Sequence, residues 1–364
     1  MSDADIAVVG GGIIGCLVAH EITRRDPRPR VTLLDRDVVA SGASRRSAGL
    51  HFPRGATERV RRLSAHSQAA YARLAAEDPT LPIHPLPLHM LATDPAHIGR
   101  TYLTTARPAP AEQVPGGLVA VPPGTGVWTG QGCQYADVGV LTEALATSLR
   151  PRLALREATR VTAVEPGPRD VTLHLSTGGT LTASRVVLAP GPWLADPAWA
   201  SLVEPLGARV KKIVALHVDR APTEDDGVIV FEDEDAFLLP LRHRGHWLFS
   251  YTCQEWDVDP DALAGGLSAA DLTQAHACLN RYAPALAERT TSGRVFCDAY
   301  SPTREPIVRT LDDGGRVVFA GAAGGSGYRL APALAAETAD LLHIAPGGTG
   351  HPGHPGPTGR RTAA

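Results

Sequence analysis

The N-terminal segment DIAVVGGGIIGCLVAHEITRR, residues 5–25, constrains the fold more than any other part of the chain. A short apolar run at residues 6–9 leads directly into Gly10-Gly11-Gly12, and apolar residues then recur at helical spacing from Ile13 to Ile22. This pattern predicts a buried parallel strand, a tight turn and a helix.

The three glycines of Gly10-x-Gly12-x-x-Gly15 have the spacing of a phosphate-binding turn. Gly10 allows the tight turn, Gly12 lets the backbone approach a pyrophosphate, and Gly15 lets the helix pack closely against the strand. The pyrophosphate is then expected on the unpaired N–H groups at the start of the helix, around Ile14.

An acidic residue at the end of the next apolar strand supports a nucleotide site. The segment RVTLLDRD, residues 30–37, reads as a second buried strand that ends at Asp35, twenty residues beyond Gly15. A carboxylate at this distance accepts hydrogen bonds from an adenosine ribose. We therefore predict that the chain binds an adenine dinucleotide, with Arg36 beside the ribose.

Length and charge exclude several other classes of protein. The chain has 364 residues, enough for two domains, and its net charge of −3 provides no basic surface for nucleic acid. No apolar run reaches the ~18–20 residues that a membrane span needs, and the first strand begins too early for a signal peptide. We expect a cytoplasmic protein with no nucleic-acid partner and no membrane span.

The five cysteines and the C-terminal segment carry little functional signal. The cysteines are widely scattered without a CxxC pair, so we predict no metal site and no disulfide framework. Residues 345–364 are rich in Gly and Pro and lack apolar periodicity, which predicts a disordered tail.

The loop GASRRSAG, residues 42–49, follows the second strand, and its small hydroxyl and glycine residues suit a loop around a phosphate or a flavin edge, with a plain surface loop as the alternative. A β-meander at residues 156–185 precedes a buried strand, residues 186–189, that ends at Gly191 and Trp193. This meander and strand resemble the D-amino-acid-oxidase-like flavoproteins, a family that includes glycine oxidase and monomeric sarcosine oxidase. Residues 250–263 and 296–308 also resemble segments of that family, and VVFAGAAGGSGYRLAPALAAETADLL, residues 317–342, resembles its closing strand, glycine-rich loop and last helix.

The resemblance implies that the dinucleotide is FAD. In this family the closing loop passes beside the flavin ring, and the N-terminus of the last helix stabilises the negative charge of the reduced ring. Together with the glycine motif, it predicts a cofactor site made of Gly10, Gly12, Ile14, Gly15, Asp35, Arg36, Gly42, Ser44, Ser47, Val161, Gly191, Trp193, Cys297, Gly321, Gly324, Gly327, Tyr328 and Arg329.

The predicted fold class is α/β, with a Rossmann-like FAD-binding domain and a second, mostly antiparallel substrate domain. We assign residues 1–80, 136–200 and 295–344 to the discontinuous FAD-binding domain, and residues 81–135 and 201–294 to the substrate domain. Strands are expected at residues 206–218, 228–231, 236–241 and 247–252, forming a sheet over the flavin.

The resemblance implies a small amine or amino acid as substrate, oxidised at its C–N bond to an imine. Arg329 lies where sarcosine-oxidase-like enzymes place a carboxylate-binding lysine, and a surface-loop arginine is the alternative. Tyr251 is a candidate substrate contact or a core residue, and Arg46 a candidate flavin contact or a solvated side chain. Residues 300–302 lack the arginine that glycine oxidase carries in a G-x-R-P segment, which favours the sarcosine-like mode.

One departure from the family leaves the electron acceptor open. In the sarcosine oxidase branch a lysine above the flavin activates oxygen, whereas the corresponding strand here has Leu248. The electron acceptor is therefore O2 or another carrier. Alternatives to the amine oxidase are a tailoring enzyme that desaturates a cyclic or carrier-bound amine, and a flavin-binding subunit of a heteromeric dehydrogenase.

Cys297 is the candidate for covalent attachment of FAD. In the sarcosine oxidase branch a cysteine in a C-x-Y-x-x-x-x-D-E segment forms a thioether with the flavin 8-methyl group. Here the segment reads CDAYSPTRE, which keeps the cysteine and the glutamate but shifts the tyrosine by one position. Attachment requires a partly ionised thiol at the ring edge, and the alternative is a small buried residue that fills a strand.

Overall fold

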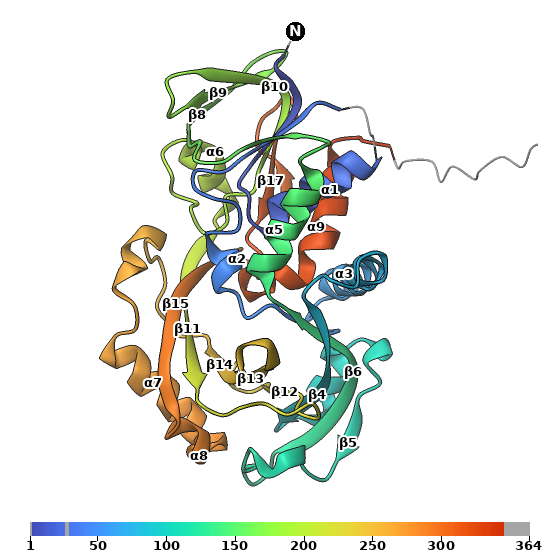
Figure 1. Ribbon diagram of the computed structural model, residues 1–364, viewed down its shortest axis with the longest axis vertical. Helices are drawn as coiled ribbons and strands as arrows, with labels where there is room; N and C mark the ends of the chain where they lie inside the picture. The colour runs from blue at the N-terminus through green and yellow to red at the C-terminus, as the bar shows by residue number, and fades with distance from the viewer. Residues whose placement is uncertain (1, 26–28, 346–364) are drawn as a thin grey trace, which may run out of the picture.

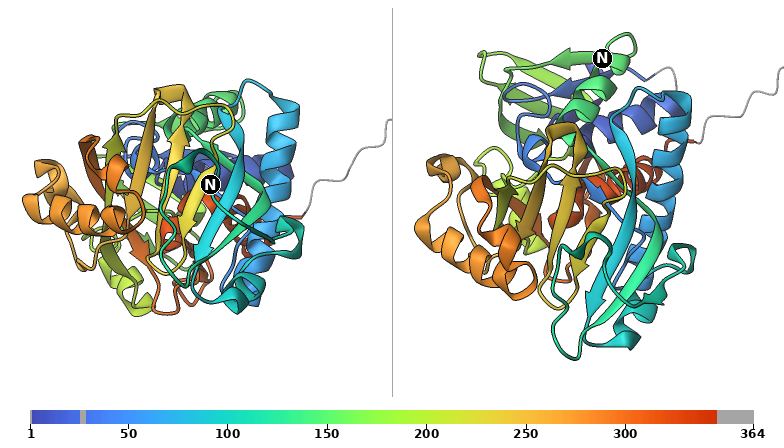
Figure 2. Two further views of the ribbon diagram at one scale, coloured as in Figure 1. Left: turned by 90° about the horizontal axis from the view of Figure 1, so that it is seen from below. Right: turned by 60° about the horizontal axis from the view of Figure 1, so that its bottom comes forward.

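Two β-sheets, one above the other, organise the molecule (Figure 1). The computed structural model describes residues 2–25 and 29–345. The predicted disordered tail therefore lies outside the described residues, except for its first residue. Helices cover one face of the upper sheet, and the lower sheet curves beneath it (Figure 2).

The first sheet has the strand order β16-β17-β10-β1-β2-β7, and the meander strands β8 and β9 extend it from β10. Strands β17, β10, β1, β2 and β7 are mutually parallel. The strands are β1 Ala4–Val9, β2 Val31–Leu34, β7 Ala154–Arg156, β8 Val161–Pro166, β9 Val171–Leu175, β10 Thr180–Leu188, β16 Ile307–Thr310 and β17 Val317–Gly321.

Strand β1 is buried on both faces, as its continuous apolar run predicts. Ile6 and Val8 point into a core shared with helices α1 (Ile13–Arg25), α5 (Val138–Leu149) and α9 (Gly327–Leu341). Ala7 and Val9 point into a second core that includes side chains of β8 and β9. Helix α3 (Glu58–Glu77) packs against α9 on its outer side.

The second sheet has the order β15-β11-β14-β13-β12-β4-β6-β3, with β5 paired to β6. All of its pairs are antiparallel except β12–β4. The strands are β3 Leu50–His51, β4 Ile83–Ala92, β5 Ala109–Ala111, β6 Gly126–Ala136, β11 Arg209–Val218, β12 Val228–Phe231, β13 Ala236–Leu241, β14 His246–Tyr251 and β15 Thr290–Tyr300.

Alternating side chains give this second sheet two buried faces. Its outer face packs against α7 (Ala269–Tyr282) and α8 (Pro284–Ala287), and its inner face carries a separate apolar cluster. The remaining α-helices are short: α2 Ala43–Arg46, α4 Pro95–Thr101 and α6 Ala200–Val203.

Polar caps set where the longer helices begin. Asp137 accepts a hydrogen bond from the Val140 N–H at the start of α5, and Thr57 accepts one from the Val60 N–H at the start of α3. At α7, the Ser268 hydroxyl and the Asp271 carboxylate cap each other's backbone N–H groups. Each cap satisfies helix donors that have no partner within the helix.

The α/β fold class and the mostly antiparallel second sheet are confirmed. The strand predicted from residue 206 begins instead at Arg209, because Glu204–Leu206 form a 3₁₀ turn that ends at Gly207 with φ of 63°. The division into two domains stays a prediction. Strand β15 runs across the proposed boundary at residue 295 and pairs with β11 along its length.

Replacing Gly15 tests how strongly the fold depends on the first turn. A Cβ at Gly15 would lie 1.8 Å from the Gly10 carbonyl oxygen, so Gly15→Ala should lower the free energy of unfolding by about 1–3 kcal/mol or more. The matched control is Gly99→Ala in α4, where an added Cβ meets nothing within 4 Å. Chemical denaturation that found equal stability for both variants would contradict this account.

Candidate functional site

The glycine turn between β1 and α1 is held by backbone contacts that leave no room for side chains. Gly10 has φ of +107°, and a Cβ there would lie 2.2 Å from the Ala189 carbonyl oxygen at the end of β10. The Ile13 N–H donates to the Ser44 hydroxyl over 2.9 Å. The start of α1 is therefore fixed against the loop that follows β2, at the edge of the sheet where its parallel strands end.

A small cavity, here the side cavity, opens beside this turn and measures about 100 Å³. Apolar side chains of Leu34, Val161 and Trp199 line it, together with the Trp193 ring. The Arg36 guanidinium lies 4.1 Å from the centre of that ring. Such a flat apolar pocket, with a carboxylate beside it, fits an adenosine group.

Asp35 is that carboxylate, at the end of β2. Its Oδ2 accepts a hydrogen bond from the Gly11 N–H (2.7 Å) and its Oδ1 accepts one from the Asp37 N–H (2.8 Å). Burial nevertheless raises the pKa of Asp35 above its ordinary value. The carboxylate is thus held in place by the turn, and an adenosine ribose is a suitable further donor to it.

A larger cavity, here the main cavity, measures about 360 Å³ and lies between the first sheet and the inner face of the second. The first turn of α9, the loop after α2 and strands β13, β14 and β15 all contribute to its lining. It shares Gly12, Ser44 and Gly191 with the side cavity. The two cavities together form an elongated site, with the glycine turn at the middle, and the residues present fit an extended dinucleotide.

Two arginines lie together in the main cavity, Arg54 after β3 and Arg329 in the first turn of α9. Arg329 donates a hydrogen bond to the Arg54 carbonyl oxygen (3.3 Å), and its guanidinium lies 4.8 Å from the centre of the Phe52 ring. Burial and the neighbouring Arg54 lower the pKa of Arg329 to about 10, so it is protonated at neutral pH.

The charges of the two arginines are balanced differently. Arg54 forms an ion pair with Glu232 over 2.9 Å, and the Glu232 side chain, which is fully buried, also accepts a hydrogen bond from Tyr102. Within residues 2–25 and 29–345, no carboxylate forms an ion pair with Arg329. Arg329 is therefore a cation without a matching anion in the main cavity.

Aromatic and histidine side chains contact the backbone of the first turn of α9. The Tyr71 hydroxyl donates to the Tyr328 carbonyl oxygen (2.6 Å), and the two rings stack at 4.6 Å. His51 Nδ1 lies 3.3 Å from the Arg329 carbonyl oxygen, and burial lowers the pKa of His51 to about 3. Neutral, hydrogen-bonded side chains thus lie against the first turn of α9.

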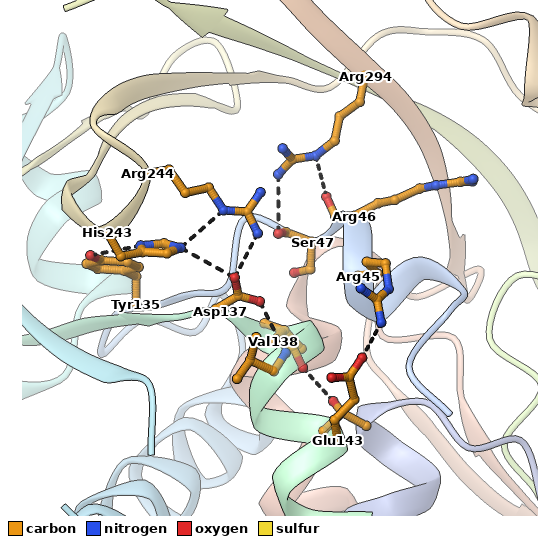
Figure 3. A network of polar contacts seen from close by, with 12 residues as sticks. Arg45, Arg46, Ser47, Tyr135, Asp137, Val138, Glu143, His243, Arg244 and Arg294 are labelled. Atoms are coloured by element: carbon orange, nitrogen blue, oxygen red, sulfur yellow. Dashed lines mark hydrogen bonds and ion pairs between the residues drawn. The ribbon is translucent and has the colours of Figure 1, made fainter. Parts of the chain in front are cut away.

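Arg294 on β15 holds the loop after α2 in place, as Figure 3 shows. Its Nε donates to the Arg46 carbonyl oxygen (2.9 Å) and its Nη2 to the Ser47 carbonyl oxygen (3.4 Å). The Arg46 side chain itself points away from these contacts, is exposed, and is not among the residues that line either cavity. Arg46 therefore takes part through its backbone carbonyl oxygen, which accepts the hydrogen bond from Arg294, and its side chain lines neither cavity.

Two further predicted residues lie outside the cavities. Ser250 and Thr252 line the main cavity, whereas Tyr251 between them points to the other face of β14, into the core beneath α7. Cys297 likewise points away from the main cavity and into the core of the first sheet. Burial raises the pKa of the Cys297 thiol to about 12, so it is not ionised at neutral pH.

The structure brings the other predicted residues together around the two cavities. The main cavity is lined by Gly12, Ile14, Gly15, Ser44, Ser47, Gly191, Gly321, Gly324, Gly327, Tyr328 and Arg329, and the side cavity by Gly10, Gly12, Asp35, Arg36, Gly42, Ser44, Val161, Gly191 and Trp193.

Sequence reasoning missed Arg54, Glu232 and Asp298. Arg54 follows a proline in an irregular segment with no periodicity, and Glu232 belongs to an acidic run that reads as a solvated turn. Asp298 carried a usable signal, because it is a single acid within the otherwise apolar run of β15. It lines the main cavity, and burial raises its pKa to about 7.

Fold and site together define a dinucleotide-dependent oxidoreductase with an FAD-binding sheet and a second sheet over the cofactor site. Residues 5–341 match the family described as FAD dependent oxidoreductase. The chain belongs to this family, whose members bind FAD, and it is an enzyme. A comparison with curated proteins found no match.

Several solved structures share this fold. Glycine oxidase from Geobacillus kaustophilus is 20% identical, with a TM-score of 0.77 over 94% of this chain and 95% of its own. NikD, an amino acid oxidase essential for nikkomycin biosynthesis, is 19% identical (TM-score 0.75, 97% and 100% covered). L-α-glycerophosphate oxidase from Mycoplasma pneumoniae is 15% identical (TM-score 0.79, 96% and 97% covered).

Among the described residues, no helix is long and apolar enough to cross a membrane. The same part of the chain contains no group of three or more His, Cys, Asp or Glu side chains that could hold a metal ion.

Removing the Asp35 carboxylate should weaken FAD binding. Asp35→Ala deletes a charged acceptor at the ribose, at a cost of about 1.5–3 kcal/mol in binding free energy. Asp312→Ala is the matched control, because Asp312 also accepts two backbone hydrogen bonds, from Arg316 (2.8 Å) and Val317 (2.6 Å), away from both cavities. Fluorescence titration of the apoproteins with FAD measures the difference, and equal FAD affinity in the two variants would exclude Asp35 as a ribose ligand.

The position of Cys297 predicts that FAD is released when the protein is denatured. A neutral thiol that points away from the main cavity cannot attack the flavin 8-methyl group. Precipitation with acid should therefore leave a colourless pellet and a yellow supernatant. A yellow pellet that becomes colourless in Cys297→Ser would show that covalent attachment does occur.

Proposed function

We propose that this enzyme oxidises the C–N bond of a small amino or imino acid to an imine, which water then hydrolyses. The observation that carries the proposal is Arg329, a half-buried guanidinium in the main cavity without a carboxylate partner among the described residues. A substrate carboxylate is the anion that such a fixed, planar cation binds best.

The neighbours of Arg329 support a role in binding rather than in structure. Its hydrogen bonds go to the Arg54 carbonyl oxygen and the Ser326 hydroxyl, both neutral acceptors. These contacts orient the guanidinium without neutralising it. Arg54 also contributes positive potential to the cavity, but its charge is paired with Glu232.

When bound, FAD supplies the acceptor for the two electrons of the substrate C–H bond. The chain positions the substrate for this step, because Arg329 fixes the carboxylate at one end of the cavity. Apolar side chains of Ile213, Phe237 and Phe296 line the same cavity from the second sheet and limit the access of water. Holding the reacting carbon in one orientation is the main contribution that the protein makes.

Two further features of the reaction are proposed more broadly. The electron acceptor is O2 or another carrier, and Leu248, fully buried in the inner-face cluster, supplies no cation for O2. Comparing the reoxidation rate of the reduced enzyme in air-saturated buffer with that in an anaerobic quinone solution distinguishes the two.

A cyclic or carrier-bound amine is the alternative substrate, and NikD is a fold neighbour from a biosynthetic pathway.

The direct test of the proposal is anaerobic reduction of the flavin by a panel of compounds. We expect N-methyl, cyclic and D-amino acids to bleach the flavin absorbance, and the corresponding carboxamides to bleach it far more slowly. Bound FAD that no amine reduces would contradict the proposal and favour a flavin-binding subunit that has no turnover of its own.

Replacing Arg329 should weaken the binding of substrates that carry a carboxylate more than the binding of substrates that do not. Arg329→Met should raise the Kd for flavin reduction by an amount equivalent to about 2–5 kcal/mol for the acid, and much less for its carboxamide. Arg62→Met, at an exposed arginine that pairs with Glu58 on α3, is the control. Equal effects on the acid and the carboxamide would assign Arg329 a structural role.

A further inference from the structure

We propose that Asp298 binds the basic nitrogen of the substrate, so that the main cavity selects compounds carrying both a carboxylate and a protonated amine. This inference rests on the proposed function, in which Arg329 binds the carboxylate. An arginine alone would serve a carboxylate or a phosphate equally well. A second group of opposite charge narrows the substrate class to zwitterions.

The direction of β15 places the Asp298 side chain in the main cavity. Phe296, Asp298 and Tyr300, at alternate positions of the strand, line this cavity, and Cys297 points into the core on the other face. Asp298 is therefore on the inner face of the second sheet, on the side that faces the FAD-binding sheet.

The cross-strand neighbour of Asp298 does not neutralise it. Lys211 is directly opposite on β11, but its ammonium group lies over the rings of Trp256 (4.9 Å) and Tyr300 (5.9 Å). No residue in the described part of the chain donates a hydrogen bond to the Asp298 carboxyl group or forms an ion pair with it. Burial is the cause that raises its pKa to about 7.

Glu232 is a nearby carboxylate whose ionic and hydrogen-bond partners are provided by the protein, which makes it a comparison for Asp298. It lies next to the main cavity and binds Arg54 (2.9 Å), His97 (2.9 Å) and Tyr102. Asp298 has none of these partners, although it is in the cavity itself. A half-buried carboxylate without donors from the protein gains from a ligand that supplies them, and an ammonium group supplies both charge and donors.

The remaining charged groups of the main cavity do not take over this role. Asp235 and Arg304 also line it, but both are exposed to solvent. Glu305 pairs with Arg59 over 3.3 Å. Among the described residues, the cavity thus contains one half-buried cation and one half-buried carboxyl group without ionic partners, Arg329 and Asp298, which match the two charges of an amino acid.

The pH dependence of ligand binding follows from the state of Asp298. The group is mostly protonated below pH 7 and mostly ionised above it, because its pKa is about 7. A protonated amine binds the ionised form, so its affinity should rise about tenfold between pH 6 and pH 8 and then level off. A carboxylate ligand without an amine should show no such rise.

Other titratable groups lie on the elements that pack around the main cavity, although Cys297 points to the opposite face of β15. Burial raises the pKa values of Cys297 to about 12 and of Tyr300 far above neutrality on β15. Burial lowers the pKa of Lys211 on β11 from its ordinary value, that of Arg329 on α9 to about 10, and that of His51 on β3 to about 3. Asp235 and Arg304 face the cavity from turns. The pH dependence of ligand binding that we assign to Asp298 is the part that is lost in an Asp298→Asn variant.

Two isosteric probes separate the amine from the carboxylate. α-Aminoisobutyrate and pivalate differ only in an ammonium group in place of a methyl group, and neither has a hydrogen on its α-carbon, so neither can be oxidised there. Their Kd values for the FAD-loaded enzyme are measured from the change in flavin absorbance, at pH 6 and pH 8. We expect the wild-type enzyme to prefer α-aminoisobutyrate at pH 8.

Variants of Asp298 and Arg329 then show which side chain binds each charge of the ligand. Asp298→Asn should weaken α-aminoisobutyrate at least tenfold at pH 8, leave pivalate unchanged and abolish the pH dependence. Arg329→Met should weaken both probes. If Asp298→Asn changes both Kd values equally or neither, or if the wild-type enzyme binds the two probes equally well, the amine site is not at Asp298.

The outcomes also separate this inference from the proposed function. Carboxylate binding that depends on Arg329 but shows no amine preference would overturn the inference and leave the proposed function standing. Failure of both probes to bind the wild-type enzyme would count against both. If Asp298→Asn does not retain FAD, the comparison of the two probes on the wild-type enzyme remains a test, since equal affinity for α-aminoisobutyrate and pivalate at pH 8 excludes the proposal.

Discussion

The contact between the backbones of Gly10, Gly15 and Ala189 is the constraint on which the rest of the structure depends. Added Cβ atoms would lie 2.2 Å from the Ala189 oxygen at Gly10 and 1.8 Å from the Gly10 oxygen at Gly15. Because β1, α1 and β10 meet this closely, the helix N-terminus and the carboxyl ends of the strands open onto one shared site. The side cavity and the main cavity both begin there.

The second sheet completes the main cavity. Its inner face closes the main cavity with apolar side chains, and its strand β15 contributes a carboxyl group to the lining. The first turn of α9 adds a guanidinium from the FAD-binding side. Opposite charges without ionic partners thus enter one low-polarity cavity, one from helix α9 and one from strand β15, and in such surroundings each charge interacts strongly with a ligand of complementary charge.

Features that depend on local sequence could be predicted, and features that depend on side-chain direction could not. The glycine turn, the strand ending at Asp35 and the strands Val228–Phe231 and Ala236–Leu241 follow from short-range patterns and appear in the structure. For Tyr251 the sequence left a substrate contact and a core position open, because a shift of one residue along a strand reverses the face; the side chain points into the core. Arg54 and Asp298 are brought together only by the packing of distant segments, which no local pattern encodes.

A crystal structure of the FAD-loaded enzyme with α-aminoisobutyrate at pH 8 tests the central claim most directly, because it shows where both charges of a ligand bind. The account predicts the ligand in the main cavity, with its carboxylate within hydrogen-bond distance of Arg329 and its nitrogen within hydrogen-bond distance of Asp298. A ligand bound in the reverse orientation, or bound without contact to either side chain, would contradict it.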